Sequence, residues 1–307
     1  MILIPGKSFK GKLPLFSNHE ISVATRLKND VVMLSETIGE RNICCRPAAL
    51  KYAEEFIFDT FNDLGYNLRR ETYYVDGVEV ANIEAEIVGT RKRDEIVVVG
   101  SHYDSAEGTP GANDNATGVA ATLELARHFK DLQPERTVRF VGFVNEEPPY
   151  FATKNMGSWV YASGAKARKE KIIAMLCLEC LGVYSDEVGS QVLTAPLDKL
   201  YPNTGNFIAF CSNPSSYPLL RKCIKEFRET TKFPSEGLVA PVVIPVIGWS
   251  DHRNFWEFGY PAIMITDTAL FRDSHYHLPT DTYQRLNFER MSRVVIGIGH
   301  AVENLTM

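Results

Sequence analysis

The spacing of apolar residues along the chain predicts helices that alternate with strands. In residues 47–64 apolar side chains recur every three or four positions, which is typical of a helix with one buried face. Gly65 directly after it predicts the end of that helix. Residues 96–99 are Ile-Val-Val-Val, a β-branched run typical of a strand buried on both faces. Asp76-Gly77, between two strand-like runs, predicts a tight hairpin turn.

The same alternation continues to the end of the chain. We predict further helices at 117–129, 157–170, 217–230 and 287–304, and strands at 83–88, 95–101, 137–144, 171–179, 207–211 and 261–266. Strands separated by helices predict a largely parallel sheet with helices on both faces. The expected fold class is therefore α/β, a three-layer α/β/α sandwich around a mixed, largely parallel central sheet.

The chain is expected to form one domain after a short lead-in. Residues 1–32 have the composition of a polar lead-in, with Gly, Pro, Lys and Asn, and residues 33–307 carry the alternating pattern. No internal repeat and no low-complexity linker divides the second segment. Longer inserts are expected near residues 184–206 and 232–250.

The composition is that of a soluble globular protein, with 45% hydrophobic and 23% charged residues. A net charge of −5 argues against nucleic acid as a partner. No apolar run reaches the roughly 18 residues that a membrane helix needs, so no membrane is expected as a partner. Residues 1–7 lack the pattern of a signal peptide. We therefore expect a cytoplasmic protein, with a trimmed secreted form as the alternative.

Six cysteines occur in the chain. Cys177 and Cys180 form a C-x-x-C pair, which in some proteins is a redox motif. Residues 172–178, however, have the pattern of a buried strand, in which cysteine acts as a small hydrophobic residue. We therefore expect six free thiols.

Carboxylate and imidazole side chains follow several predicted strands directly. Those that follow the strands at 95–101, 137–144 and 171–179 are His102, Asp104, Glu146, Glu147 and Glu179. A glycine-rich loop carries Asp114, and a loop after the strand at 261–266 carries His277. Open α/β sheets bind ligands at the carboxyl ends of their strands, so we expect these side chains to gather at one site.

These residue types are the ones that a zinc site requires. Zinc binds imidazole nitrogen and carboxylate oxygen, and a catalytic zinc keeps one position for water. A pair of zinc ions needs a bridging carboxylate, and a free carboxylate must take the proton of the water. Glu146 and Glu147 are adjacent, so one of them can bind a zinc ion while the other stays free to take the proton. Asp104 comes two residues after His102 and can hold that imidazole in one tautomer.

Five segments in this order resemble a known family. They are residues 101–105, 110–118, 145–147, 250–252 and 276–282. Together they resemble the M28 family of zinc peptidases, which includes bacterial leucyl-type aminopeptidases. The resemblance implies the zinc-exopeptidase-like form of the α/β/α fold, with residues 33–307 as the catalytic domain. It also implies two zinc ions and a hydroxide between them that hydrolyses the first bond of a peptide with a free N-terminus.

Position by position, the resemblance implies a role for each candidate ligand. Asp114 would bridge the two ions, and the peptide bond after it would be cis. His102 and Glu179 would complete one zinc site, and Glu147 and His277 would complete the other.

The resemblance implies further roles around the two ions. Glu146 would be the general base, and Tyr276 would stabilise the developing oxyanion. Three residues would support the ligands: Asp104, Ser250 and Asp281. Of these, Asp104 would hold His102, and Ser250 would orient the last ligand histidine.

One position departs from the family pattern, and several alternatives stay open. Most aminopeptidases of the family have aspartate at the position of Glu179, whose side chain is one methylene longer. A glutaminyl cyclase-like acyltransferase with one zinc and a catalytically silent binding domain are the alternative functions. Carboxypeptidase action would need a cation for the substrate carboxylate, and Arg253 or Arg272 could serve. Cobalt or manganese could replace zinc. Neither the preferred N-terminal residue nor the oligomeric state follows from the sequence.

Overall fold

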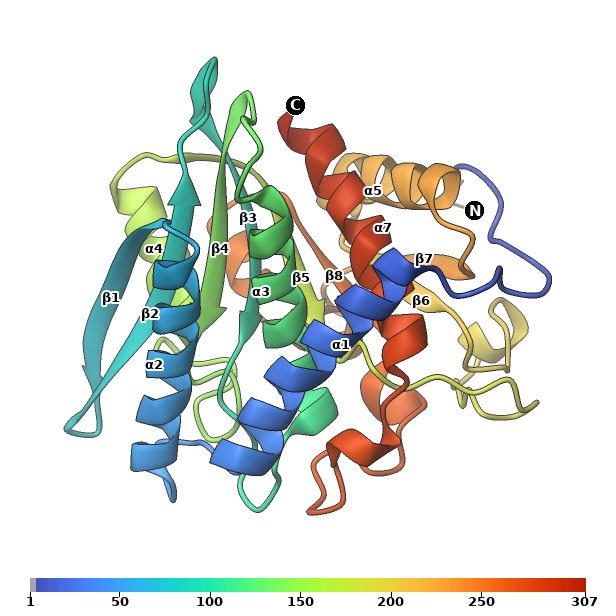
Figure 1. The fold of residues 1–307 in the computed structure, drawn as a ribbon, viewed down its shortest axis with the longest axis horizontal. Helices are drawn as coiled ribbons and strands as arrows, with labels where there is room; N and C mark the ends of the chain where they lie inside the picture. Colours follow the sequence, from blue (N-terminus) through green and yellow to red (C-terminus); the bar gives the residue numbers. More distant parts are fainter. Residues whose placement is uncertain (1–3) are drawn as a thin grey trace.

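A mixed eight-stranded sheet with helices on both faces forms the centre of the protein, whose computed structural model describes residues 4–307 (Figure 1). The strands are β1 (Asn67–Val75), β2 (Val78–Ile87), β3 (Lys92–His102), β4 (Arg136–Phe143), β5 (Lys171–Glu179), β6 (Ile208–Ser212), β7 (Ser235–Val239) and β8 (Ala262–Thr266). Their order in the sheet is β1-β2-β4-β3-β5-β8-β6-β7. The pairs β3-β4, β3-β5, β5-β8 and β6-β7 are parallel, and the others are antiparallel.

Helices cover the two faces of the sheet unequally. They are α1 (Asn18–Val32), α2 (Pro47–Asp63), α3 (Thr117–Phe129), α4 (Gly157–Ala167), α5 (Tyr217–Thr230), α6 (His252–Glu257) and α7 (Phe288–Thr306). Helices α1, α2, α3, α5 and α7 pack on one face, and α4 and α6 pack on the other (Figure 1). The predicted α/β/α sandwich with a mixed, largely parallel sheet is therefore confirmed.

Short helical turns lie in the connecting segments. They are η1 (Met33–Ile38), η2 (Ala112–Ala116), η3 (Leu197–Lys199), η4 (Pro214–Ser216), η5 (Pro245–Gly248), η6 (Ala269–Phe271) and η7 (Tyr283–Arg285). Within residues 4–307, no helix is both long and apolar enough to cross a membrane.

The hairpin and the thiols agree with the sequence prediction. Asp76 and Gly77 have φ of 50° and 81°, the backbone that a two-residue turn between β1 and β2 requires. Gly65 has φ of 80° and follows Leu64, the C-cap of α2. All six cysteines are free. The predicted strand at 83–88 is the second half of β2 and does not form a strand of its own.

The prediction of a polar lead-in at residues 1–32 missed helix α1. Ser17 begins this helix with a capping box, and its buried face packs against α3 and α7. Its buried hydrophobic residues are Val23, Ala24, Leu27 and Val31. The apolar stripe is narrow and the other faces are polar, so the average composition concealed the helix. Strand β7 and helix α6, each only five or six residues long, were also not predicted.

Candidate active site

The carboxyl ends of β3, β4 and β5 meet at one edge of the sheet because the three strands run parallel. Strand β3 ends at His102 and β5 ends at Glu179. Glu146 and Glu147 follow β4 after a turn at Asn145, whose φ is 59°. The four predicted site side chains are all buried, with exposed fractions between 1% and 7%. The structure thus brings these four residues together as the pattern predicted.

Asp114 lies in η2, where the backbone departs from helical geometry at Asp114 and Asn115. The peptide bond between these two residues is cis, as the resemblance implied. The Asn115 side chain donates to Leu178 O at 2.9 Å and accepts from Cys180 N at 3.1 Å. These bonds attach the loop of Asp114 to strand β5, beside Glu179.

Two further residues support the Asp114 loop. Asp281 accepts from Asn113 N at 2.8 Å and from Asp114 N at 3.2 Å. Arg41 has no exposed surface and donates to Gly111 O at 2.9 Å. A Cβ at Gly111 would lie 2.5 Å from Asp114 O, so the loop requires glycine there. Asp281 contacts the loop as a supporting residue should, whereas nothing in the sequence pattern pointed to Arg41.

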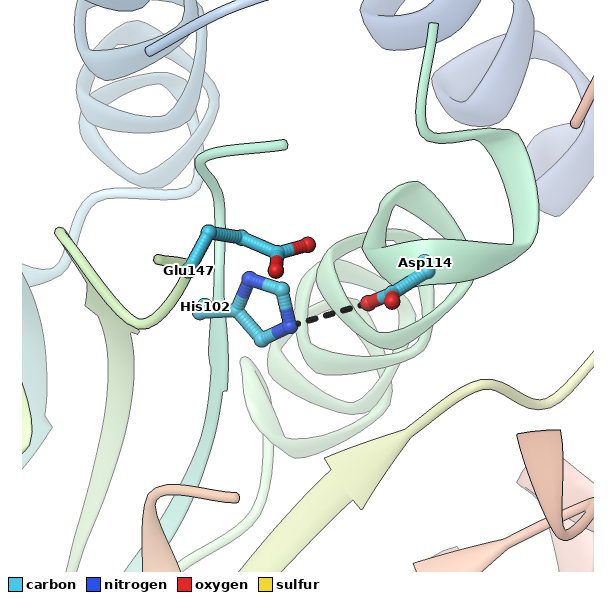
Figure 2. Close-up of side chains that lie close together, drawn as sticks. All are labelled: His102, Asp114 and Glu147. Carbon is cyan, nitrogen blue, oxygen red and sulfur yellow. Dashed lines mark ion pairs between the residues drawn. The ribbon is translucent and has the colours of Figure 1, made fainter. Parts of the chain in front are cut away.

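The two carboxylate oxygens of Asp114 face two separate groups of side chains. Oδ1 lies 3.2 Å from His102 Nε2, which is itself 3.4 Å from Glu179 Oε2. Oδ2 lies 3.0 Å from His277 Nε2, which is itself 3.2 Å from Glu147 Oε2. The five predicted ligands therefore form two groups that share Asp114. Figure 2 shows His102, Asp114 and Glu147 pointing toward one another from three different segments.

The donor atoms of these two groups fit metal ions. Among the described residues, no hydrogen-bond partner is found for the buried atoms His102 Nε2, His277 Nε2 and Glu147 Oε1. Buried polar atoms almost always have a partner, so these three atoms call for a bound species. Imidazole nitrogen and carboxylate oxygen are ligands of zinc. His102, Asp114 and Glu147 also offer ligand atoms within 4.8 Å of one another.

Crowding of buried carboxyl groups changes their protonation. Burial raises the pKa of Glu146 well above its ordinary value, although the His102 charge lowers it in part. Burial, with the Asp114 charge, raises the pKa of Glu147 to about 7. The pKa of Glu179 is raised too, again by burial first. Burial alone would raise the pKa of Asp114, but the His102 and His277 imidazoles beside its carboxylate lower it. Bound cations would favour the charged carboxylates and so lower these pKa values again.

Asp104 connects the first histidine with the two glutamates. Its carboxylate accepts from Glu146 N at 3.1 Å and from Glu147 N at 3.0 Å. Its Oδ1 lies 3.4 Å from His102 Nδ1, and its main-chain oxygen lies 3.2 Å from the same nitrogen. A donor role for Nδ1 leaves Nε2 free to bind a cation.

Ser250 contacts a different ligand from the one we expected. The resemblance implied that it would orient His277, but its hydroxyl donates to Glu179 Oε2 at 2.5 Å. Its Oγ also lies 3.1 Å from Cys177 Sγ. Ser250 lies two residues before the start of α6, which packs against β5, and this places its hydroxyl beside Glu179. The expected partner of Ser250 was therefore wrong, although it does support a ligand.

We expect Ser250→Ala to weaken the binding of one zinc ion by about 10- to 100-fold, the usual effect of losing a group that orients a ligand. The variant removes the shortest hydrogen bond to the Glu179 carboxylate. Competition with a chromogenic chelator measures the affinity, and Ser22→Ala, at an exposed serine of α1, is the matched control. Equal zinc affinity in both variants would contradict this role.

Tyr276 lies against the second group of ligands. Its ring stacks on the His277 ring, with centroids 4.0 Å apart and planes 15° apart. Burial raises the pKa of Tyr276, with Asp114 and Glu147 adding to the effect, so its hydroxyl keeps its proton. Tyr276 also lines an apolar cavity together with Glu179.

The fold and this cluster define a metal-dependent hydrolytic centre at the carboxyl edge of an α/β sheet. The sequence model of peptidase family M28 matches residues 82–302. The uncharacterized protein YfbL of Escherichia coli (strain K12) is 35% identical over 282 residues, which cover 89% of this chain and 85% of that protein. The chain belongs to peptidase family M28.

Solved structures confirm the fold. BSAP, a zinc aminopeptidase from Bacillus subtilis, superimposes with a TM-score of 0.75 over 96% of each chain at 16% identity. The glutaminyl cyclase of Fimbriiglobus ruber superimposes with a TM-score of 0.63 over 96% of each chain at 20% identity. At these identities the likeness concerns the fold, so the choice between the two activities depends on the site.

Proposed function

We propose that this protein is a two-metal aminopeptidase that removes the N-terminal residue of peptides with a free amino terminus. The observation that carries the proposal is the geometry of Asp114, whose two oxygens face two separate donor groups. Each group holds one histidine and one glutamate besides Asp114, a ligand set suited to zinc, with cobalt and manganese as substitutes.

Bound cations would polarise the scissile carbonyl and make a water molecule nucleophilic. The chain itself provides the proton transfer. Glu146 belongs to neither donor group, and its Oε2 lies 3.9 Å from His102 Nε2 at the edge of the cluster. Burial raises its pKa, which suits a group that takes a proton and returns it to the leaving amine. The Tyr276 hydroxyl, a neutral donor, would face the carbonyl oxygen as negative charge develops on it.

The charges of the site favour an amino terminus over a carboxyl terminus. Glu146 belongs to neither donor group, and its carboxylate beside the cations can attract the ammonium group of a peptide N-terminus. The two arginines considered for a substrate carboxylate have other contacts. Arg253 lies over the Phe151 ring at 5.2 Å, and Arg272 donates to Gln191 Oε1 at 2.9 Å and to Val183 O at 3.1 Å. These contacts support aminopeptidase over carboxypeptidase action.

Glutaminyl cyclase activity remains the second candidate because a glutaminyl cyclase shares the fold. Such an acyltransferase would need one zinc ion. The five ligand side chains, arranged as two groups, favour the two-metal hydrolase. A silent binding domain would have no use for so many buried carboxylates.

A panel of aminoacyl-4-nitroanilides, each with a free and with an acetylated amino group, tests the proposal in the presence of zinc. We expect hydrolysis of free substrates only, because the acetyl group removes the ammonium charge. Peptides with a free or an amidated carboxyl terminus should be cleaved equally well. Cleavage of the acetylated substrates, or release of pyroglutamate from N-terminal glutamine as the only activity, would refute the proposal.

A further inference from the structure

An apolar cavity opens beside the candidate metal centre and extends away from it across the sheet. Glu179 and Tyr276 lie at the end nearest the metal centre, and the cavity encloses about 860 Å³, its open mouth included. The cavity lies on the same face of the sheet as α4 and α6, over strands β6 and β7. Helix α5 covers these two strands on the opposite face only. Loops close it there. Apolar side chains from those loops include Leu193, Leu197, Trp249, Leu270 and Phe271.

Paired strands place four of its residues in a single row. Glu179 on β5 pairs with Thr266 on β8, Thr266 pairs with Ala209 on β6, and Ala209 pairs with Glu236 on β7. Paired residues on neighbouring strands point to the same face, and all four line the cavity. Three strand spacings of about 4.8 Å separate the two glutamates, roughly 14 Å from backbone to backbone.

The floor between the two glutamates is mostly apolar, and Thr266 adds one hydroxyl to it. A second row, Met264, Cys211 and Leu238, runs beside the first and also lines the cavity. Beyond Thr266, a ligand that extends from the metal centre along this floor therefore meets aliphatic and thiol surface until it reaches Glu236. Only a long side chain could cover that distance.

Glu236 ends this path with a carboxylate that forms no close ion pair within the described part of the chain. The residue is partly buried, and among residues 4–307 no Lys or Arg nitrogen lies within 4.0 Å of its carboxylate oxygens. Arg228 is nearby, but it donates to Ser235 Oγ and O and to Pro5 O. Burial raises the pKa of Glu236, and Arg228, Ser8 and Lys10 offset this only in part. A partly buried carboxylate without an ion-pair partner in contact favours binding of a cation.

We propose that this cavity selects peptides whose N-terminal residue is arginine or lysine. The aliphatic part of that side chain would lie on the floor of the cavity, and its cationic end would bind the Glu236 carboxylate. Long basic side chains suit such a site because they combine an apolar stem with a charged end. This inference rests on the proposed aminopeptidase function and adds Glu236 as the residue that determines specificity. An apolar cavity without Glu236 would favour leucine or phenylalanine.

Arginine and citrulline 4-nitroanilides provide the test because the two side chains have nearly the same shape and differ in charge. We expect the wild-type protein to hydrolyse the arginine substrate with a kcat/KM about 10- to 100-fold above that for citrulline. This is the usual effect of one hydrogen bond between charged groups, here the guanidinium and the Glu236 carboxylate. Glu236→Gln should reduce this ratio to near one, and Glu236→Asp should retain part of it.

The outcomes separate the two proposals. If the wild-type protein hydrolyses leucine anilide but does not distinguish arginine from citrulline, the inference about Glu236 is wrong and the proposed function stands. If Glu236→Gln keeps the wild-type ratio, the inference is wrong as well. If no free aminoacyl anilide is hydrolysed at all, the proposed function itself fails and this inference fails with it. The wild-type ratio decides even if a variant does not fold.

Discussion

Glu146→Gln is expected to lower kcat by about 10²- to 10⁴-fold, the usual contribution of a positioned general base. The amide keeps the shape of the side chain but cannot take a proton. Since Glu146 belongs to neither donor group around Asp114, the variant should keep its full zinc content. Steady-state hydrolysis of an aminoacyl anilide and elemental analysis of the same sample measure both quantities.

The matched control for this variant is Glu229→Gln, an exposed glutamate of α5 that pairs with Lys225. It should keep wild-type activity and zinc content. If Glu146→Gln retains zinc and hydrolyses at the wild-type rate, Glu146 is not the base. If Glu146→Gln loses zinc together with activity, Glu146 is a metal ligand, and the assignment of Glu146 to neither donor group is wrong.

Asp114→Ala is expected to remove both zinc ions, because this one side chain faces both donor groups. Activity should fall by more than about 100-fold, because loss of a residue that only orients a metal ligand already lowers activity by up to about 100-fold. The thermal midpoint of the wild-type protein should fall when a chelator removes the metal, since bound ligands stabilise the folded state. The midpoint of the variant should not respond to the chelator.

Asp94→Ala is the control for this experiment, because the Asp94 side chain is 76% exposed and far from the cluster in the sheet. It should keep both ions and the chelator response. Retention of one tightly bound ion by Asp114→Ala would show that Asp114 does not bridge two sites.

The sequence predicted those features that depend on local patterns. Helices at 117–129 and 217–230 have the predicted bounds, since each has a regular apolar face. The site ligands were also predictable, because a parallel sheet brings the ends of β3, β4 and β5 to one edge. Motif order then distinguished Asp114 and His277 from the other acidic and histidine residues.

Features that depend on contacts between distant segments were not predictable. Arg41 holds the Asp114 loop from a position about 70 residues away, and no periodicity reports such a contact. The partner of Ser250 depends on how α6 packs against β5. Glu236 aligns with Glu179 only through the register of four strands, and β7 itself, Ser-Glu-Gly-Leu-Val, lacks the apolar run that identified β6 and β8. Tertiary packing therefore determined what the sequence left open.

Zinc stoichiometry tests the central claim most directly. The protein is stripped with a chelator, titrated with zinc while hydrolysis of an aminoacyl anilide is followed, and analysed for zinc per chain. A two-metal aminopeptidase predicts saturation at two zinc ions per chain, with both groups around Asp114 filled at full activity. Saturation at one ion per chain, with full activity or with cyclisation of N-terminal glutamine, would contradict the account.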